Sequence, residues 1–220
     1  MTGSTNLAVA GAPGWMVAEM PPGYQTRLLE IERLSADLQA MDRIGCILWE
    51  TGEALRGAVG ALFAALKCEV DLTPGDTRAI AVRLGGTRRL LLVVSETSSP
   101  IQKTNEELAR SFQAVQFAGA NDRVVLVVNN HPETPPADRP EPILPDALGV
   151  LQRMGVDLLT TVALFRLWRL SLEDQQKTRM ALDRLHAQDG GQFFFPARPP
   201  HPVADAGLPV AGVPTLASAR

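Results

Sequence analysis

Apolar side chains recur at intervals of three to five positions between residues 24 and 49, and charged residues lie mostly between them. The apolar series consists of Leu28, Ile31, Leu34, Leu38, Met41 and Cys46. This spacing predicts an amphipathic helix. Thr51-Gly52 interrupts the pattern, and Thr51 is suited to cap a second helix over residues 53–67. That segment is apolar on most faces, and the small residues Gly57 and Gly60 favour close packing on a sheet.

The next part of the chain changes from helical spacing to short, nearly continuous apolar runs. Residues 68–72 predict a short strand, and residues 78–101 predict a β-hairpin that turns at Gly85-Gly86. Residues 123–130 and 156–161 are two further apolar runs. Runs of this kind are typical of strands that are buried on both faces of a helix-covered sheet.

Helical patterns separate these later strands, at residues 103–118, 145–154 and 162–187. The predicted order of elements is α-α-β-β-β-α-β-α-β-α. The hairpin makes the sheet mixed, and the helical crossovers make its later strands parallel. We therefore expect a three-layer α/β domain with a mixed sheet of about five strands.

Composition divides the chain into three parts. Residues 1–23 contain Gly and Pro without periodicity, which predicts a flexible N-terminal arm, and residues 24–187 form the α/β domain. Residues 188–220 are a Pro/Ala-rich tail. Inside the domain, residues 131–145 contain six prolines and predict an extended loop.

Charge and cysteine content narrow the functional classes. The net charge of −3 and the sequence pI near 5.7 argue against dominant nonspecific binding to nucleic acid. Nucleic acid is therefore an open but not a favoured partner. Cys46 and Cys68 have no metal-site spacing and are expected to be reduced thiols. No segment has the length of a membrane span or the pattern of a signal peptide. We expect a cytoplasmic protein.

Three stretches together resemble the restriction-endonuclease-like PD-(D/E)XK domains of many bacterial proteins. Residues 47–59 read ILWETGEALRGAV, similar to that family's LxxTGxxLExAV. Residues 90–103 read LLLVVSETSSPIQK, similar to ALVEVKGSxGPIKK. Residues 124–167, with their Pro-rich loop and Thr160-Thr161, resemble a third and longer family pattern. The resemblance implies a restriction-endonuclease-like fold, in which active members hold a divalent ion with carboxylates and use a lysine to activate water.

The positions that would carry this chemistry hold other residues. When the stretches are matched at Pro100-Ile101, the acidic position falls on Val93 and the lysine position on Ser95. The helical glutamate of many members falls on Arg56. The preceding aspartate falls near Ile80, and Asp76 reaches that place only in a longer hairpin. The resemblance therefore implies a nuclease scaffold with a degenerate catalytic motif.

Several polar residues remain open to two interpretations. Asp76 and Glu96 are the candidate carboxylates if the hairpin is irregular; otherwise Asp76 is a turn residue and Glu96 a solvated charge at a strand end. The three cations Arg88, Arg89 and Lys103 form either a small anion-binding patch or a solvated hairpin tip. His131 ends a buried strand, where ligands gather in α/β folds, or is a loop residue.

The tail contains one aromatic cluster, Phe193, Phe194 and Phe195, which is expected to dock on the domain or on a partner. Together these features favour a non-catalytic, nuclease-like domain that serves as a protein-interaction or scaffolding module, with an unidentified protein partner and no cofactor. The alternatives are a Mg²⁺-dependent DNA endonuclease that uses Asp76 and Glu96, or a domain that binds DNA without cleaving it.

Overall fold

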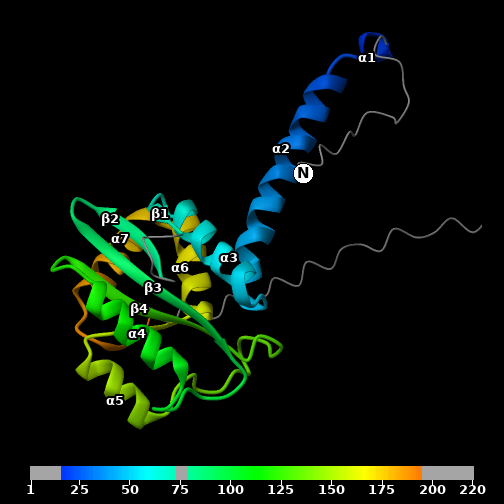
Figure 1. The fold of residues 1–220 in the computed structure, drawn as a ribbon. Helices are drawn as coiled ribbons and strands as arrows, with labels where there is room; N and C mark the ends of the chain where they lie inside the picture. Colours follow the sequence, from blue (N-terminus) through cyan, green and yellow to red (C-terminus); the bar gives the residue numbers. More distant parts are fainter. Residues whose placement is uncertain (1–15, 73–78, 195–220) are drawn as a thin grey trace, which may run out of the picture.

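A six-stranded mixed sheet forms the centre of the molecule in this computed structural model, which describes residues 16–72 and 79–194 (Figure 1). The strands are β1 (Glu69–Asp71), β2 (Ile80–Gly85), β3 (Arg88–Thr97), β4 (Asp122–Asn130), β5 (Asp157–Thr160) and β6 (Gly191–Gln192). They lie side by side in chain order. The first three are antiparallel neighbours, and β3 to β6 are parallel, as the helical crossovers predict.

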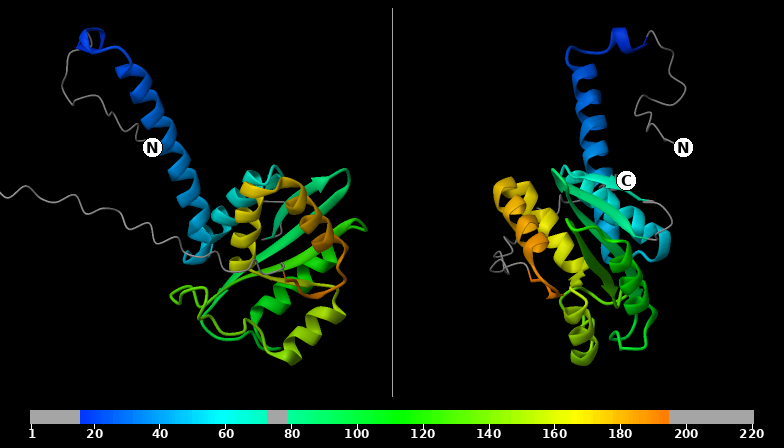
Figure 2. Two further views of the ribbon diagram at one scale, coloured as in Figure 1. Left: turned by 180° about the vertical axis from the view of Figure 1, so that it is seen from behind. Right: turned by 60° about the vertical axis from the view of Figure 1, so that its left-hand side comes forward.

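Helices cover both faces of this sheet (Figure 2). The helical elements are α1 (Met16–Glu19), α2 (Tyr24–Gly45), the short 3₁₀ helix η1 (Cys46–Leu48), α3 (Gly52–Ala65), α4 (Glu106–Phe117), α5 (Pro145–Arg153), α6 (Thr161–Glu173) and α7 (Gln175–Ala187). Side chains of α3, α6 and α7 pack on one face, and those of α4 and α5 pack on the other. This arrangement confirms the three-layer α/β fold, with six strands where about five were expected.

Strand β3 shows why its sequence is almost wholly apolar. It pairs with β2 through the turn at Gly85 and Gly86, whose φ angles of 118° and 60° lie in the region that favours glycine. Because successive side chains point to opposite faces, Leu90 and Leu92 join the core under α3, while Leu91 and Val93 join the core under α4. Both faces are covered, so both sets of side chains are apolar.

The segment predicted as one helix over residues 162–187 is two helices. Asp174 interrupts them with extended backbone (φ −149°, ψ 95°), and its carboxylate accepts a hydrogen bond from the backbone N–H of Lys177 at 2.9 Å. This is the N-cap bond of α7. The apolar faces of both helices pack on the same core, so the helical spacing of apolar residues continues across the break. In the sequence, only the capping residue Asp174 indicates where the second helix begins.

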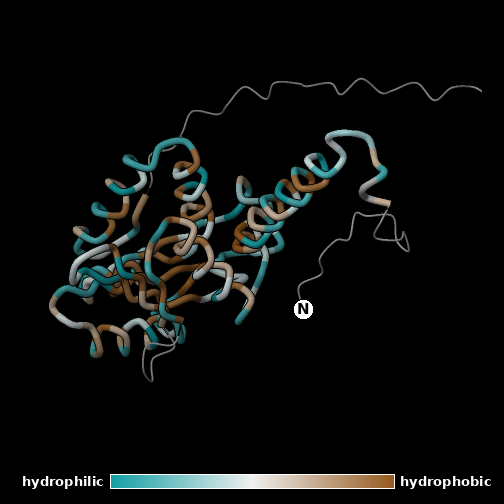
Figure 3. The backbone as a smooth tube through the Cα atoms, turned by 90° about the horizontal axis from the view of Figure 1, so that it is seen from above, coloured by the Kyte–Doolittle hydropathy of each residue, from teal (hydrophilic) through white to brown (hydrophobic). Residues whose placement is uncertain are grey.

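The helix α2 begins at Tyr24 as predicted, but its apolar face does not pack on the domain. Ile44, near its C-terminal end, is the buried residue of α2. The helix meets η1 and α3 there and projects away from the sheet (Figure 1). Hydrophobic and hydrophilic residues alternate along this helix in the hydropathy colouring of Figure 3. The sequence pattern predicted an apolar face but carried no information about what covers it.

The C-terminal end of the described chain adds β6 to the sheet edge beyond the boundary expected at residue 187. Gly191 and Gln192 pair with β5, and the backbone N–H of Phe193 donates to the carbonyl of Leu158 at 2.9 Å. The Phe193 side chain belongs to the core under α3, α6 and α7. The first residues of the expected tail are therefore part of the folded domain.

Candidate functional site

Three polar side chains meet where the parallel strands β3, β4 and β5 end. Asn129 is near the end of β4, Thr161 begins α6 directly after β5, and Arg139 lies in the Pro-rich loop between β4 and α5. Asn129 and Thr161 are fully buried, and Arg139 is partly buried. We refer to these three residues as the strand-end cluster. The carboxyl ends of parallel strands are the usual position of functional sites in α/β folds, so this cluster is the candidate functional site.

Asn129 connects the cluster through its side-chain amide. Its Oδ1 accepts hydrogen bonds from Arg139 Nη1 at 2.8 Å and from Thr161 Oγ1 at 2.9 Å. Its Nδ2 donates to the backbone carbonyl of Glu50 at 2.9 Å. Both lone pairs of the amide oxygen are therefore used. The single side chain of Asn129 joins β4, α6, the Pro-rich loop and the segment before α3.

Arg139 binds neutral oxygen atoms. Its Nε donates to the carbonyl of Thr134 at 2.9 Å, and its Nη2 donates to the carbonyl of Leu48. Loss of solvent around the guanidinium lowers the pKa of Arg139 below its ordinary value. No carboxylate among the described residues pairs with it. The cation holds the Pro-rich loop against η1, and its charge is balanced by carbonyl and amide dipoles.

The Pro-rich loop is also fixed at its two ends. Asn130 Nδ2 donates to the carbonyl of Pro140 at 2.7 Å, and Ile101 forms an isolated parallel bridge with Ile143. His131 begins the loop with a φ of 49°, in the left-handed region, and its backbone N–H donates to the carbonyl of Thr97 at 2.7 Å. Its Nε2 is buried, and no hydrogen bond to it appears in the described part of the chain. His131 is therefore the first residue of the loop that follows β4.

The two positions of the degenerate motif on β3 lie on the face covered by α4. Val93 is 6% exposed and packs in the core of that face, and Ser95 is buried and donates to Glu107 Oε1 of α4 at 3.1 Å. Apolar packing and a structural hydrogen bond therefore occupy the places that the resemblance assigns to a carboxylate and a lysine.

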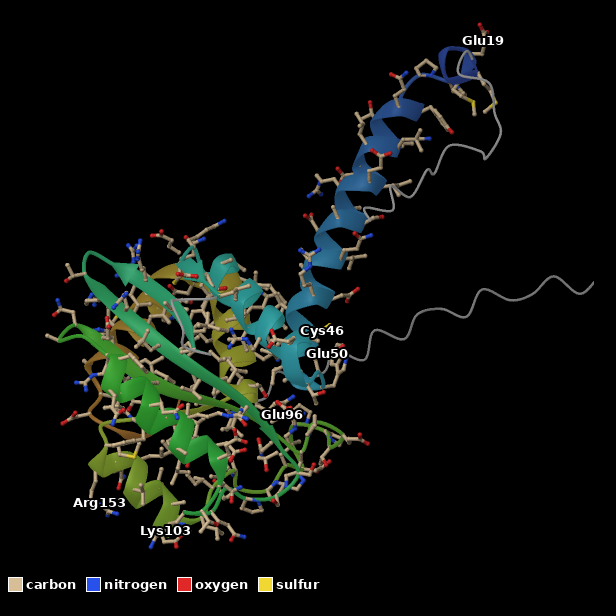
Figure 4. All side chains as sticks on the ribbon, viewed as in Figure 1. Glu19, Cys46, Glu50, Glu96, Lys103 and Arg153 are labelled. Carbon is tan, nitrogen blue, oxygen red and sulfur yellow. The ribbon has the colours of Figure 1, made fainter. Side chains whose placement is uncertain are left out.

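Glu96 lies on the other face of β3. The register with β4 is continuous from Arg89 to Thr97 and pairs Glu96 with Asn129, so no bulge turns the Glu96 side chain toward Val93. Glu96 is exposed at the end of the strand. Figure 4 labels it together with Glu50, which lies in the segment before α3. A motif register one residue later would place Val94 and Glu96 on the α3 face and would still supply no carboxylate-lysine pair.

Arg56, at the position of the helical glutamate, holds the end of β1. Its Nη2 donates to the carbonyl of Leu72 at 2.6 Å, and its Nε lies 3.4 Å from a Glu53 carboxylate oxygen. A Cβ on Gly60 would lie 2.7 Å from Leu72 Cδ2, so α3 approaches β1 closely here, as its small residues predicted. Arg56 belongs to the α3 layer and Val93 to the α4 side of the sheet. The motif positions therefore do not meet on one face.

The cations of the expected anion patch are each paired with a carboxylate. Arg88 lies 2.7 Å from Asp183, and Lys103 lies 3.3 Å from Asp146. Arg89 binds both carboxylate oxygens of Asp122, at 2.8 and 2.6 Å. The side-chain hydrogen bond from Arg89 is the main cause that lowers the pKa of Asp122. The hairpin tip is thus held by ion pairs.

The remaining candidate residues from the sequence lie in different places. Asp76 and Phe195 lie outside the described residues. Phe193 is 7% exposed and Phe194 is 69% exposed, so the two neighbouring side chains face the core and the surface respectively. Within residues 16–72 and 79–194, no group of three or more His, Cys, Asp or Glu side chains is placed to hold a metal ion.

Replacement of Phe193 tests this division. Phe193→Ala should lower the free energy of unfolding by about 3 kcal/mol, because it removes a buried aromatic ring from the core. Phe194→Ala should change it by less than about 0.5 kcal/mol, because that ring is exposed. Urea denaturation of both variants measures the difference. Equal effects would contradict the assignment of Phe193 to the core.

Asp157 is a buried carboxyl that no sequence pattern marks as a candidate. It is fully buried at the start of β5, its Oδ1 accepts from the backbone N–H of Gly190 at 3.1 Å, and no hydrogen bond to its Oδ2 is found among the described residues. Loss of solvent raises the pKa of Asp157 to about 7, although Arg123 opposes the shift. This carboxyl lies at the start of β5, where it fixes the backbone of Gly190 next to the edge strand β6.

Comparison of the chain with family models, with curated proteins and with solved structures finds no match. The PD-(D/E)XK resemblance therefore remains a hypothesis. In the ranges that the structure covers, no helix combines the length and apolar character needed to cross a membrane.

Proposed function

We propose that this protein is a non-catalytic domain with a nuclease-like scaffold, and that it acts in the cytoplasm as a protein-interaction or scaffolding module. The observation that carries the proposal is the exposed apolar surface of helix α2. The helix projects from the domain and exposes a series of large apolar side chains, which water disfavours. On one side of the helix these side chains are Ile31 (44%), Leu34 (47%), Leu38 (62%) and Met41 (45%), whereas Leu29 (66%) is exposed on the opposite side and is not part of this face.

The polar groups of the domain support a structural role for the strand ends. Arg139 and Thr161 both donate to Asn129, which leaves the amide oxygen of Asn129 without a free lone pair. Asn129 and Arg139 also bind backbone carbonyls. Val93 and Ser95 contribute to packing on α4. These contacts fix the Pro-rich loop, η1 and the base of α2 relative to the sheet. In this proposal the domain serves as a rigid base that presents α2, and Phe194 is a further candidate contact.

A cleavage assay tests the non-catalytic part of the proposal. Purified protein incubated with double- or single-stranded DNA and Mg²⁺ or Mn²⁺ should produce no cleavage, because the motif positions hold Val93, Ser95 and Arg56. Metal-dependent cleavage that Glu96→Ala or Asp76→Ala abolishes would establish the endonuclease alternative.

A capture experiment tests the interaction part. The full chain should retain binding partners from a lysate, and Leu34→Glu/Leu38→Glu should lose them, since the charges interrupt the exposed apolar face of α2. Leu29→Glu adds the same charge on the opposite side of the helix and is the matched control. Identical recovery by all three proteins would contradict a role for this face.

A further inference from the structure

One face of α2 carries a regular apolar stripe. Ile31, Leu34, Leu38 and Met41 follow one another at spacings of three, four and three residues, which is the spacing of the a and d positions of a coiled coil. Each is 44–62% exposed. No segment among the described residues covers this face, whereas Ile44 is the residue that α2 buries against the domain.

The stripe continues into Trp49 at the base of the helix. The next position of the same series is Gly45, and a Cβ placed on Gly45 would lie 3.7 Å from the Trp49 ring. Trp49 therefore lies over position 45, and it is itself 53% exposed. The four aliphatic side chains and this ring expose roughly 500 Å² per chain, so a pair would bury roughly 1,000 Å², at the low end for a specific interface.

We propose that α2 pairs in antiparallel orientation with α2 of a second copy of this chain. This inference rests on the proposed function, because it identifies the partner of the α2 face. Leu34 packs against Leu38 of the second copy, and Ile31 packs against its Met41. The stripe spans only two heptads, so the expected dissociation constant is micromolar, on the order of 1–100 µM.

Charge selects the antiparallel orientation. A parallel pair would place Arg27 beside Arg27 of the second copy, at a d position, where the two like charges repel. The antiparallel pair instead brings Arg27 beside Gly45 and Asp42 of the second copy, near the carbonyl end of that helix. There the guanidinium also faces Trp49, whose ring attracts a cation. The antiparallel pair also brings Asp37 near Asp37 of the second copy, but each Asp37 is bound to Arg33 of its own helix at 2.8 Å, which offsets its charge.

Analytical ultracentrifugation of the full chain over about 1–500 µM tests the pairing. The wild-type protein should show a monomer-dimer equilibrium, and Leu34→Glu/Leu38→Glu should weaken it more than 100-fold. Leu29→Glu, on the opposite side of α2, should leave it within about twofold. All three replaced side chains are exposed, so the variants should remain folded, and circular dichroism checks this. A wild-type monomer throughout this range overturns the proposal.

A charge exchange tests the orientation. Arg27→Glu and Asp42→Arg should each weaken the dimer about fivefold or more, and the double variant should restore most of the affinity, because residues 27 and 42 of different copies then attract again. Failure of the double variant to recover overturns the antiparallel pairing. A monomeric protein that still captures partners through α2 would reject self-pairing and leave the proposed function standing. DNA cleavage would reject the proposed function whatever the oligomeric state.

Discussion

Val93→Asp is expected to destabilise the domain by about 3–5 kcal/mol at pH 7, since it places a carboxyl in apolar surroundings and removes a packed side chain. Val93 is 6% exposed and packs with Leu91 and Leu126 in the core under α4. For a chain of this size the loss corresponds to a fall of roughly 10 °C in Tm. Thermal unfolding at several pH values measures it.

The pH dependence of this loss in stability shows whether the buried charge causes it. Burial raises the folded-state pKa of the introduced carboxyl above its unfolded value near 4, so the folded state binds its proton more strongly. The stability difference between Val93→Asp and wild type should therefore shrink as the pH falls from 7 toward 4. Val93→Ala is the control, because it removes packing without adding a charge and should lose stability independently of pH.

An unchanged Tm for Val93→Asp would show instead that the side chain faces a wet cleft. The fold would then provide the space that a metal-binding carboxylate needs. If Mn²⁺ also raised the Tm of this variant but not that of wild type, the position would be a metal-ligand position of the kind that the PD-(D/E)XK resemblance implies. The same variant thus tests the fold and the interpretation of the motif.

The sheet and its helices could be predicted because their signals are local. The apolar runs at β3 and β4 reflect burial on both faces, and Gly85-Gly86 supplies the turn between β2 and β3. The break at Asp174 was not predicted, because helical spacing continues through it. The two-residue strand β6 was assigned to the tail, since Gly191 and Gln192 have no strand pattern and are fixed by pairing with β5.

The strand-end cluster shows why site prediction was less complete. Asn129, Arg139 and Thr161 all lie within residues 124–167, the longest stretch of the family resemblance, yet nothing local indicates that Asn129 binds the other two. Asn129 also contacts Glu50, 79 residues earlier in the chain, and Arg139 contacts Leu48, 91 residues earlier. Hydrogen bonds between such distant segments depend on the completed fold. These three residues were therefore not selected as candidates from the sequence.

The lone Asp157 illustrates the same limit and leads to the second large expected effect. It follows Val156 in a short apolar strand and has no charged neighbour in the sequence, but the fold encloses it beneath Gly190 and near Arg123. Burial raises its pKa from 3.8 to about 7, whereas in the unfolded chain it ionises near 3.8. Between these two values the folded state binds one more proton than the unfolded state, so stability must fall as the pH rises.

We expect Asp157→Asn to remove this pH dependence. The free energy of unfolding of the variant minus that of wild type should rise by about 2–3 kcal/mol as the pH increases from 5 to 8. The reason is that wild type carries a buried charge at the higher pH, whereas the amide stays neutral. Urea denaturation at both pH values measures the change, and other titrating groups cancel in the comparison. Asp189 raises the pKa of Asp157, so Asp189→Asn should move the transition to lower pH without abolishing it. A stability difference between Asp157→Asn and wild type that is the same at pH 5 and pH 8 would show that Asp157 is already ionised in the folded protein, with its charge balanced by Arg123 and the backbone of Gly190.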